Sequence, residues 1–243
     1  MNLLAFDTST DQMSIALQRG DGAETTLWQH TAAGGALTST HLIPEIQRLM
    51  AQAQLSFDAL DAIVFGAGPG SFTGLRTACS VAQGLGFGAG VPLLPVDTLM
   101  AVAQDAWWQL GGPSRLSVMA LLDARMDEMY AASYIFDSDK ISIDKHYSLI
   151  SPENLVWNGV DVLAGNVFAA YGARLNAAGA QRVPALPTAA ALLRLAPRLL
   201  ALGAGVPAEQ ALPTYIRDKV AQTTQERADA KLALAPALPV AAQ

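Results

Sequence analysis

The sequence predicts an α/β fold of two lobes that share one order of secondary-structure elements. Segments typical of strands and helices alternate through the first hundred residues. A Gly-Gly-Pro-Ser stretch at 111–114 is the clearest linker in the chain. After it, the same order of elements returns in weaker form, without a visible sequence repeat. We therefore expect a first lobe over residues 1–110, a smaller second lobe over 111–212, and a C-terminal segment over 213–243.

The first lobe is expected to begin with three strands in a meander. Residues 3–7 are a short apolar run, and residues 13–18 alternate as a half-buried strand does. The Gly-Asp-Gly turn at 20–22 leads into a third strand over 25–31. Apolar residues then recur at helical spacing over 42–53. The other elements expected in this lobe are a strand ending at Phe65, a helix from Ser71 to about Phe87, a strand over 91–96 and a helix over 98–110.

The second lobe shows a similar alternation. The expected strands cover 116–122, 128–136, 146–150 and 161–164, and the expected helices cover 167–178 and 192–202. The last stretch, 229–243, consists mainly of Ala, Pro and Leu, and we expect it to be a disordered tail.

The most informative segment is residues 62–76, where an apolar strand runs into closely spaced glycines. Gly66, Gly68 and Gly70 occupy alternate positions, and Ser71 then opens a helix. Glycines permit backbone conformations with positive φ and close approach of other atoms. The spacing is neither Gly-x-Gly-x-x-Gly nor a Walker loop. Two interpretations stay open: a stiff strand-to-helix connection, or a place where an anion or another chain meets the backbone closely.

The sequence Gly-Ala-Gly-Pro-Gly-Ser-Phe-Thr-Gly-Leu-Arg at 66–76 resembles the signature of the TsaB family, the smaller actin-like subunits of the bacterial machinery that makes threonylcarbamoyladenosine in tRNA. Four further segments, 3–10, 95–99, 121–125 and 213–217, resemble that family in the expected order. The resemblance implies the actin-like fold of sugar kinases, heat-shock ATPases and actin. In that fold, duplicated ribonuclease-H-like lobes face each other across a cleft.

The resemblance also implies where a nucleotide would bind. In actin-like ATPases the first turn binds phosphate and its Asp holds the metal-bound water, which here places Asp7, Thr8 and Ser9 at the candidate cofactor site. Thr8 replaces the usual glycine, the turn at 123–125 also lacks its glycine, and the turn at 164–166 has one glycine where two are expected. We therefore expect that nucleotide hydrolysis is lost and that no cofactor is resident. A nucleotide at an interface shared with the transferase TsaD stays open, and Asp7 fits a ligand role and a turn-forming role equally well.

Metal or hydrolase chemistry has little support. His41 and Glu45 lie four residues apart on one helix, where the related transferase TsaD carries two metal-binding histidines. One imidazole and one carboxylate do not complete a metal site, so none is expected. The chain also lacks His-Glu-x-x-His and Gly-x-Ser-x-Gly motifs, which leaves peptidase activity without a candidate centre.

The two first-lobe helices are candidates for a partner surface. Small residues recur every fourth position at Gly74, Ala78, Ala82 and Gly86, and packing on the protein's own sheet is the favoured explanation for that row. The helix over 42–53 also carries a wide apolar stripe, however, and the hypothesis is that the two helices together present more apolar surface than one sheet face can cover. In the TsaB family these helices resemble the surface that binds TsaD, or a second copy when TsaD is absent. The predicted contact residues are Leu42, Ile46, Leu49, Met50, Gly74, Ala78, Val81 and Leu85.

The composition of the chain limits which partners and which cell compartment are expected. The net charge is −6 and only 15% of residues are charged, so a phosphate backbone is repelled on average and tRNA is expected to be reached only through a complex. The single cysteine, Cys79, lies in a helical pattern and suits a reducing cytoplasm. The most apolar helix is interrupted by Arg194 and Pro197, and no basic leader precedes the first strand, so we expect a cytoplasmic protein without a membrane span.

Two functions from different classes follow. The resemblance implies a non-catalytic scaffold and activator for threonylcarbamoyladenosine formation, which binds TsaD and, with it, the ATPase TsaE. Such a subunit acts by favouring one arrangement of its partner. The alternative is an autonomous actin-fold ATPase or small-molecule kinase that uses Asp7 and Asp123.

Overall fold

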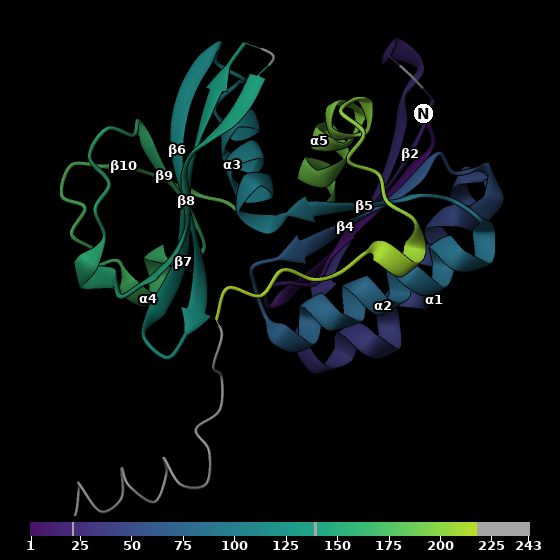
Figure 1. The fold of residues 1–243 in the computed structure, drawn as a ribbon, viewed down its shortest axis with the longest axis horizontal. Helices are drawn as coiled ribbons and strands as arrows, with labels where there is room; N and C mark the ends of the chain where they lie inside the picture. Colours follow the sequence, from purple (N-terminus) through teal and green to yellow (C-terminus); the bar gives the residue numbers. More distant parts are fainter. Residues whose placement is uncertain (21, 139, 218–243) are drawn as a thin grey trace, which may run out of the picture.

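The computed structural model describes residues 1–20, 22–138 and 140–217, which form two five-stranded sheets (Figure 1). The first sheet has the order β3-β2-β1-β4-β5, and the second has the order β8-β7-β6-β9-β10. In each, a three-stranded antiparallel meander continues into two parallel strands. The two lobes therefore share one topology, and the expected actin-like fold is confirmed. The expected tail over 229–243 lies outside the described residues.

Most elements lie where the sequence places them. The first sheet and its helices comprise β1 Leu3–Asp7, β2 Gln12–Arg19, β3 Thr26–Ala33, α1 Thr38–Ala53, β4 Ala62–Gly68, α2 Phe72–Ala89 and β5 Leu93–Asp97. The elements that follow are α3 Thr98–Gln109, β6 Arg115–Arg125, β7 Glu128–Asp137, β8 Lys140–Ile150, β9 Val162–Gly165, α4 Phe168–Tyr171, β10 Gln181–Pro184 and α5 Ala189–Ala201.

The prediction of a helix over 167–178 is wrong beyond Tyr171. There α4 ends after four residues, and short turns lead to the strand β10, which the sequence did not indicate. Leu175 and Ala177 are nonetheless buried in the second core. Apolar residues at short spacing can fill a core from irregular turns as well as from a helix, which explains the error.

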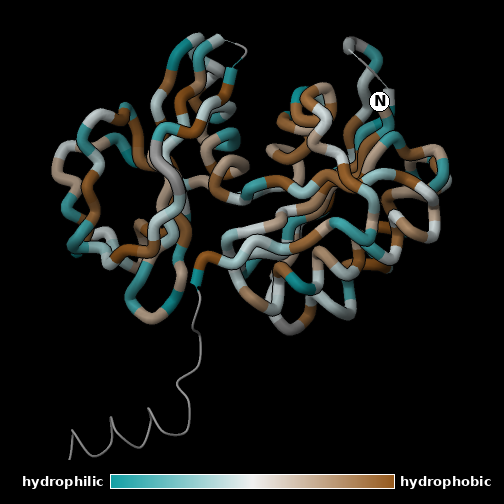
Figure 2. Tube along the Cα trace, viewed as in Figure 1, coloured by the Kyte–Doolittle hydropathy of each residue, from teal (hydrophilic) through white to brown (hydrophobic). Residues whose placement is uncertain are grey.

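Both faces of the first sheet are covered by helices, with α1 and α2 on one side and α5 on the other (Figure 1). Along β1, Leu4 and Phe6 belong to the cluster under α1 and α2, whereas Leu3 and Ala5 pack against α5. The strands at the centre of the sheet are accordingly hydrophobic along their length (Figure 2).

The helices are exchanged between the lobes. Although α3 follows the first-lobe strand β5, it packs mainly on β6, β7 and β9 of the second sheet. In turn, α5 comes from the second half of the chain and packs on β1, β2 and β4. The boundaries at 110 and 212 stay predictions, and the packing adds that each sheet is covered by a helix from the other half of the chain.

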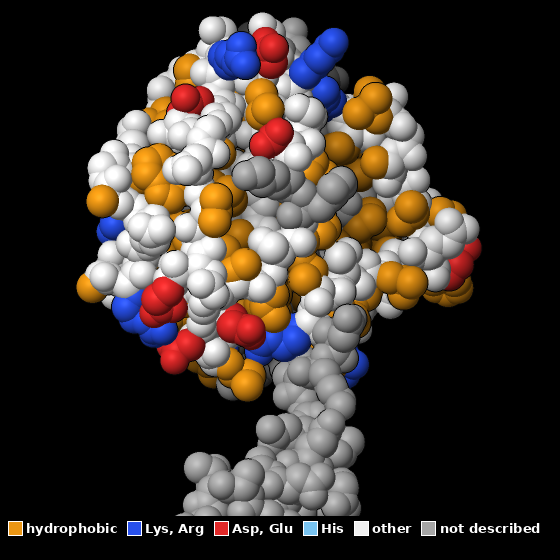
Figure 3. Space-filling model, turned by 60° about the vertical axis from the view of Figure 1, so that its left-hand side comes forward, with side chains coloured by type: hydrophobic (Ala, Val, Ile, Leu, Met, Phe, Trp, Pro, Cys, Tyr) orange, Lys and Arg blue, Asp and Glu red, His pale blue; other side chains and the backbone are white. Residues whose placement is uncertain are grey.

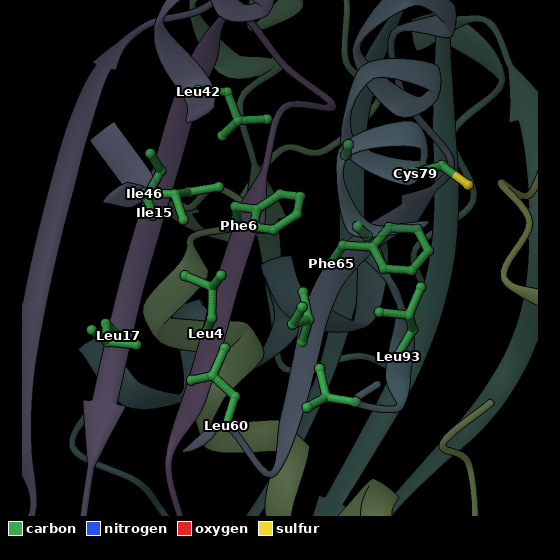
Figure 4. Close-up of a cluster of buried hydrophobic side chains, with 14 of the residues drawn as sticks. Leu4, Phe6, Ile15, Leu17, Leu42, Ile46, Leu60, Phe65, Cys79 and Leu93 are labelled. Carbon is green, nitrogen blue, oxygen red and sulfur yellow. The ribbon is translucent and has the colours of Figure 1, made fainter. Parts of the chain in front are cut away.

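The apolar stripe of α1 faces its own sheet, which corrects the partner prediction. Leu42 and Ile46 point toward Phe6 and Ile15 (Figure 4). Because side chains inside the core cannot reach another protein, these positions are structural. The five predicted contact residues that are in fact buried are Leu42, Ile46, Leu49, Met50 and Ala78. The remaining three, Gly74, Val81 and Leu85, are partly exposed, and their role stays a prediction.

Within the described residues, no helix combines the length and the apolar character needed to cross a membrane.

Candidate functional site

A cleft of about 300 Å³ lies between the lobes. Its walls come from the turn after β1, the start of α2, the β6–β7 hairpin and the C-terminal segment 213–217, which we call the strap. Residues from all four include Ser9, Ser71, Arg125 and Arg217. The two lobes thus meet where the family resemblance places a nucleotide.

Glycines at the end of β4, in the turn that follows it and in the first part of α2 let the turn after β1 pack directly on these elements. A Cβ atom added at Gly66 would lie 1.7 Å from Oδ2 of Asp7, and one at Gly70 would lie 2.6 Å from Cβ of Ser9. A Cβ at Gly74 would lie 1.8 Å from the carbonyl oxygen of Thr8. The close approach is therefore made by another part of the same chain, and the glycines serve packing at this point.

Asp7 and Thr8 are engaged inside the protein. Oδ1 of Asp7 accepts hydrogen bonds from the backbone N–H of Ser9 at 2.9 Å and from its hydroxyl at 2.7 Å. The Thr8 hydroxyl donates to the carbonyl oxygen of Gly74 at 2.7 Å. Of the three predicted cofactor residues, only Ser9 lines the cleft. The geometry favours the turn-forming role for Asp7.

The other carboxylate oxygen of Asp7 is buried and has no hydrogen-bond partner among the described residues. Burial raises the pKa of Asp7 from 3.8 to about 7, against the opposing effect of the Ser9 hydrogen bonds. A carboxyl in this environment resists ionisation near neutral pH, which makes it a poor ligand for a metal-bound water.

Arg125 fills the second-lobe turn and reaches across the cleft. Its Nη2 lies 2.6 Å and 2.8 Å from the two carboxylate oxygens of Asp11. Its Nη1 lies 3.3 Å from Oδ2 of Asp123, whose Oδ1 accepts from the Tyr171 hydroxyl at 2.8 Å. Such an exposed pair contributes little stability. These contacts nevertheless hold the bulky side chain of Arg125 at the turn where the resemblance to actin-like ATPases implies room for phosphate.

The strap is the part of the site that the sequence did not reveal. Gly68 has a φ of +117°, and a Cβ there would lie 2.4 Å from the carbonyl oxygen of Thr214. The Thr214 N–H donates to the carbonyl oxygen of Ala67 at 2.7 Å. Beyond it, Arg217 donates to Glu128 of β7. The strap therefore joins the glycine segment to the second lobe (Figure 1). Its Pro-Thr-Tyr-Ile-Arg sequence was visible, but its contacts depend on the tertiary fold.

Glu45, the carboxylate four residues from His41, is engaged by neighbouring basic side chains. Glu45 lies 2.6 Å from Nε of Arg48 and 3.8 Å from Nδ1 of His30, and the hydrogen bond from Arg48 lowers its pKa. His41 is exposed. Across 1–20, 22–138 and 140–217, no group of three or more His, Cys, Asp or Glu side chains is arranged to hold a metal ion.

The duplicated lobes and the cleft between them place this chain in the actin-like class. Sequence comparison agrees: the family model described as "TsaD: tRNA N6-adenosine threonylcarbamoyltransferase" matches residues 35–234. Two curated proteins named "tRNA threonylcarbamoyladenosine biosynthesis protein TsaB" are also similar. The protein from Escherichia coli K12 is 32% identical over 230 residues, covering 91% of this chain and 96% of its own. The protein from Haemophilus influenzae is 33% identical, covering 90% and 95%.

A solved structure of YeaZ from Pseudomonas aeruginosa is 37% identical and superposes with a TM-score of 0.78, covering 88% of this chain and 99% of that one. The chain therefore belongs to the TsaB family, which confirms the resemblance that residues 66–76 carry.

Proposed function

We propose that this protein takes part in threonylcarbamoyladenosine formation in tRNA as a non-catalytic scaffold, in the cytoplasm. It binds the transferase TsaD and, with it, the ATPase TsaE, and it pairs with a second copy when TsaD is absent. The observation that carries the proposal is the similarity to TsaB proteins over nine tenths of the chain. The cleft supports it, since Asp7, Thr8 and Asp123 already hydrogen-bond within the protein.

The exposed side of α1 and α2 is the surface that we assign to TsaD. A groove lined by residues of both helices, among them Ser39, Arg76 and Val81, crosses this side. Large apolar side chains stand around it: Ile43 is 41% exposed, and Phe72 is 45% exposed. Exposed apolar groups gathered beside a groove are typical of protein-binding surfaces. We call this surface the α1–α2 face and define it by Leu37, Ile43, Phe72, Val81 and Leu85.

Replacing Ile43 with Glu is expected to weaken binding to TsaD by about tenfold or more, because a charge would be buried against the partner. Titration of purified TsaD by calorimetry measures this, with circular dichroism to verify the fold. The matched control is Leu27→Glu on the edge strand β3, since Leu27 is 43% exposed. The next residue, Trp28, packs on the cluster under α1 and α2, so Leu27 faces the opposite side of the sheet. Normal binding by Ile43→Glu would contradict the assignment. Ile46→Glu is unsuitable, because Ile46 is fully buried.

The alternative function, an autonomous ATPase or small-molecule kinase, makes a separate prediction. A kinase must bind ATP and magnesium by itself, whereas we expect the isolated protein to give no binding heat in calorimetry. Adding TsaD then tests whether a nucleotide binds at a shared interface. Saturable ATP binding by the isolated chain, lost in Asp123→Asn, would favour the alternative.

tRNA is expected to reach this protein only within the complex, because the chain carries a net charge of −6. On the face in Figure 3, charged side chains lie mainly toward the upper and lower ends, with apolar and uncharged side chains between them. Among the described residues seen on that face, the Lys and Arg side chains do not form a broad basic surface for a phosphate backbone.

A further inference from the structure

The start of α2 is a wall shared by two hollows. Phe72 and Thr73 line the interlobe cleft, and the same two residues line the groove of the α1–α2 face. A protein that binds in the groove and displaces Phe72 or Thr73 would therefore also alter the wall of the interlobe cleft.

The strap is fastened to this shared wall. The ring of Tyr215 lies 5.2 Å from the ring of Phe72. The Tyr215 hydroxyl accepts a hydrogen bond from Nε of Arg76 at 3.1 Å, and the Arg76 guanidinium lies 3.8 Å from the centre of the Phe72 ring. Arg76 also lines the groove. A protein bound on the α1–α2 face would thus meet the side chains that hold Tyr215.

Two residues after Tyr215, Arg217 of the strap binds the second lobe. The side chain of Arg217 is only 12% exposed, and it donates to the carboxylate of Glu128. Its Nη1 lies 3.1 Å from Sδ of Met126. Charge-assisted hydrogen bonds from a mostly buried guanidinium are among the stronger contacts that a surface segment makes. Arg217 therefore fixes the tip of the β6–β7 hairpin, which carries the cleft residue Arg125.

The strap has little freedom to absorb movement between these two ends. The hydrogen bond from Thr214 to Ala67 holds its start, and Ile216 packs against the second core. Only Ile216 separates Tyr215 from Arg217, and two extended residues span about 7 Å. Displacement of Tyr215 must consequently pass to Arg217 or break one of these contacts.

We propose that the strap couples the α1–α2 face to the interlobe cleft. In this coupling, a partner that contacts Phe72 and Arg76 steadies Tyr215, and through Arg217 it steadies the hairpin that closes the cleft. Because coupling between two sites is reciprocal, loosening the hairpin also weakens binding on the face. The inference rests on the proposed function for the identity of the partner, and its first test needs no partner.

The first test is hydrogen exchange on the isolated protein. Phe72→Ala removes the ring under Tyr215 and is expected to speed exchange of the amides at 124–130 by about fivefold, the effect of losing one typical contact. The matched control is Phe87→Ala on the same helix, where the side chain is 82% exposed and lies far along α2 from the strap. Unchanged exchange in Phe72→Ala, or an equal change in Phe87→Ala, would overturn the coupling.

The second test measures TsaD affinity in variants of Arg217, which lies outside the α1–α2 face. Arg217→Gln is expected to weaken binding about fivefold, Arg217→Lys to recover part of the loss, and Arg115→Gln, an exposed arginine of the same lobe, to change nothing. Wild-type affinity in a folded Arg217→Gln protein would overturn the inference. If the wild-type chain binds no TsaD, the proposed function fails, and hydrogen exchange alone then decides whether the strap transmits the change.

Discussion

Gly74→Ala in α2 is expected to lower the free energy of unfolding by about 3 kcal/mol or more. Gly84→Ala in the same helix is expected to raise it by up to about 1 kcal/mol. The added Cβ at position 74 would lie 1.8 Å from the carbonyl oxygen and 2.9 Å from the carbonyl carbon of Thr8. Backbone atoms cannot rotate away, so β1 and α2 would have to separate. At position 84, the added Cβ would have no described atom within 4 Å apart from its chain neighbours and the nearby backbone of its own helix.

Chemical denaturation of the two variants beside the wild type measures this difference. Both changes remove the same flexibility from the unfolded chain, so the contrast isolates the contact with Thr8. Equal stability of Gly74→Ala and Gly84→Ala would show that the first turn does not rest on the helix as closely as described.

The stability of the protein is expected to fall by about 4 kcal/mol as pH rises from about 4 to about 8, owing to Asp7. Its pKa is raised by burial from 3.8 to about 7 in the folded state. An acid with a raised pKa supports the fold while it is neutral, and this support is lost as pH rises through the folded pKa. Above about pH 7 the folded protein must hold a buried carboxylate, one oxygen of which has no hydrogen-bond partner within the described residues.

Asp7→Asn tests this sign, because an amide keeps an oxygen that can accept the two Ser9 hydrogen bonds. The variant is expected to lose most of the pH dependence and to exceed the wild type in stability at about pH 8. Any remaining fall with pH is attributed to Asp97, since burial also raises its pKa. Asp58→Asn, at an exposed position, serves as the control. Identical pH profiles for Asp7→Asn and the wild type would exclude Asp7 as the source.

The elements with strong local signals could be predicted from the sequence. The strand, glycine turn and helix around 62–89 were visible because apolar residues, glycines and the capping residue Ser71 follow each other directly. The side chain of Ser71 does accept from the N–H of Gly74, at 3.4 Å. By contrast, β10 has four residues, only one of them buried, and so gave no periodic pattern.

The candidate site was less predictable, because a periodic pattern shows which residues share a face but not what covers that face. The stripe with Leu42 and Ile46 suited a partner surface, yet the sheet covers it. Likewise, the glycines of this segment indicated close approach without showing which residues make it, namely Asp7, Ser9 and Thr8 at Gly66, Gly70 and Gly74, and Thr214 at Gly68. The strap contacts join residues such as Tyr215 and Arg76, which are 139 positions apart, so local spacing carries no trace of them.

The exchange of α3 and α5 has a consequence for biosynthesis. During translation the five strands of the first sheet are complete once Asp97 has been added, yet Leu3, Ala5 and Val64 stay uncovered until α5, ending at Ala201, leaves the ribosome. About a hundred further residues must therefore be made before that apolar surface is sealed. We therefore expect the nascent chain to carry one uncovered sheet face while residues 98–201 are made, and the two lobes to mature together rather than one after the other.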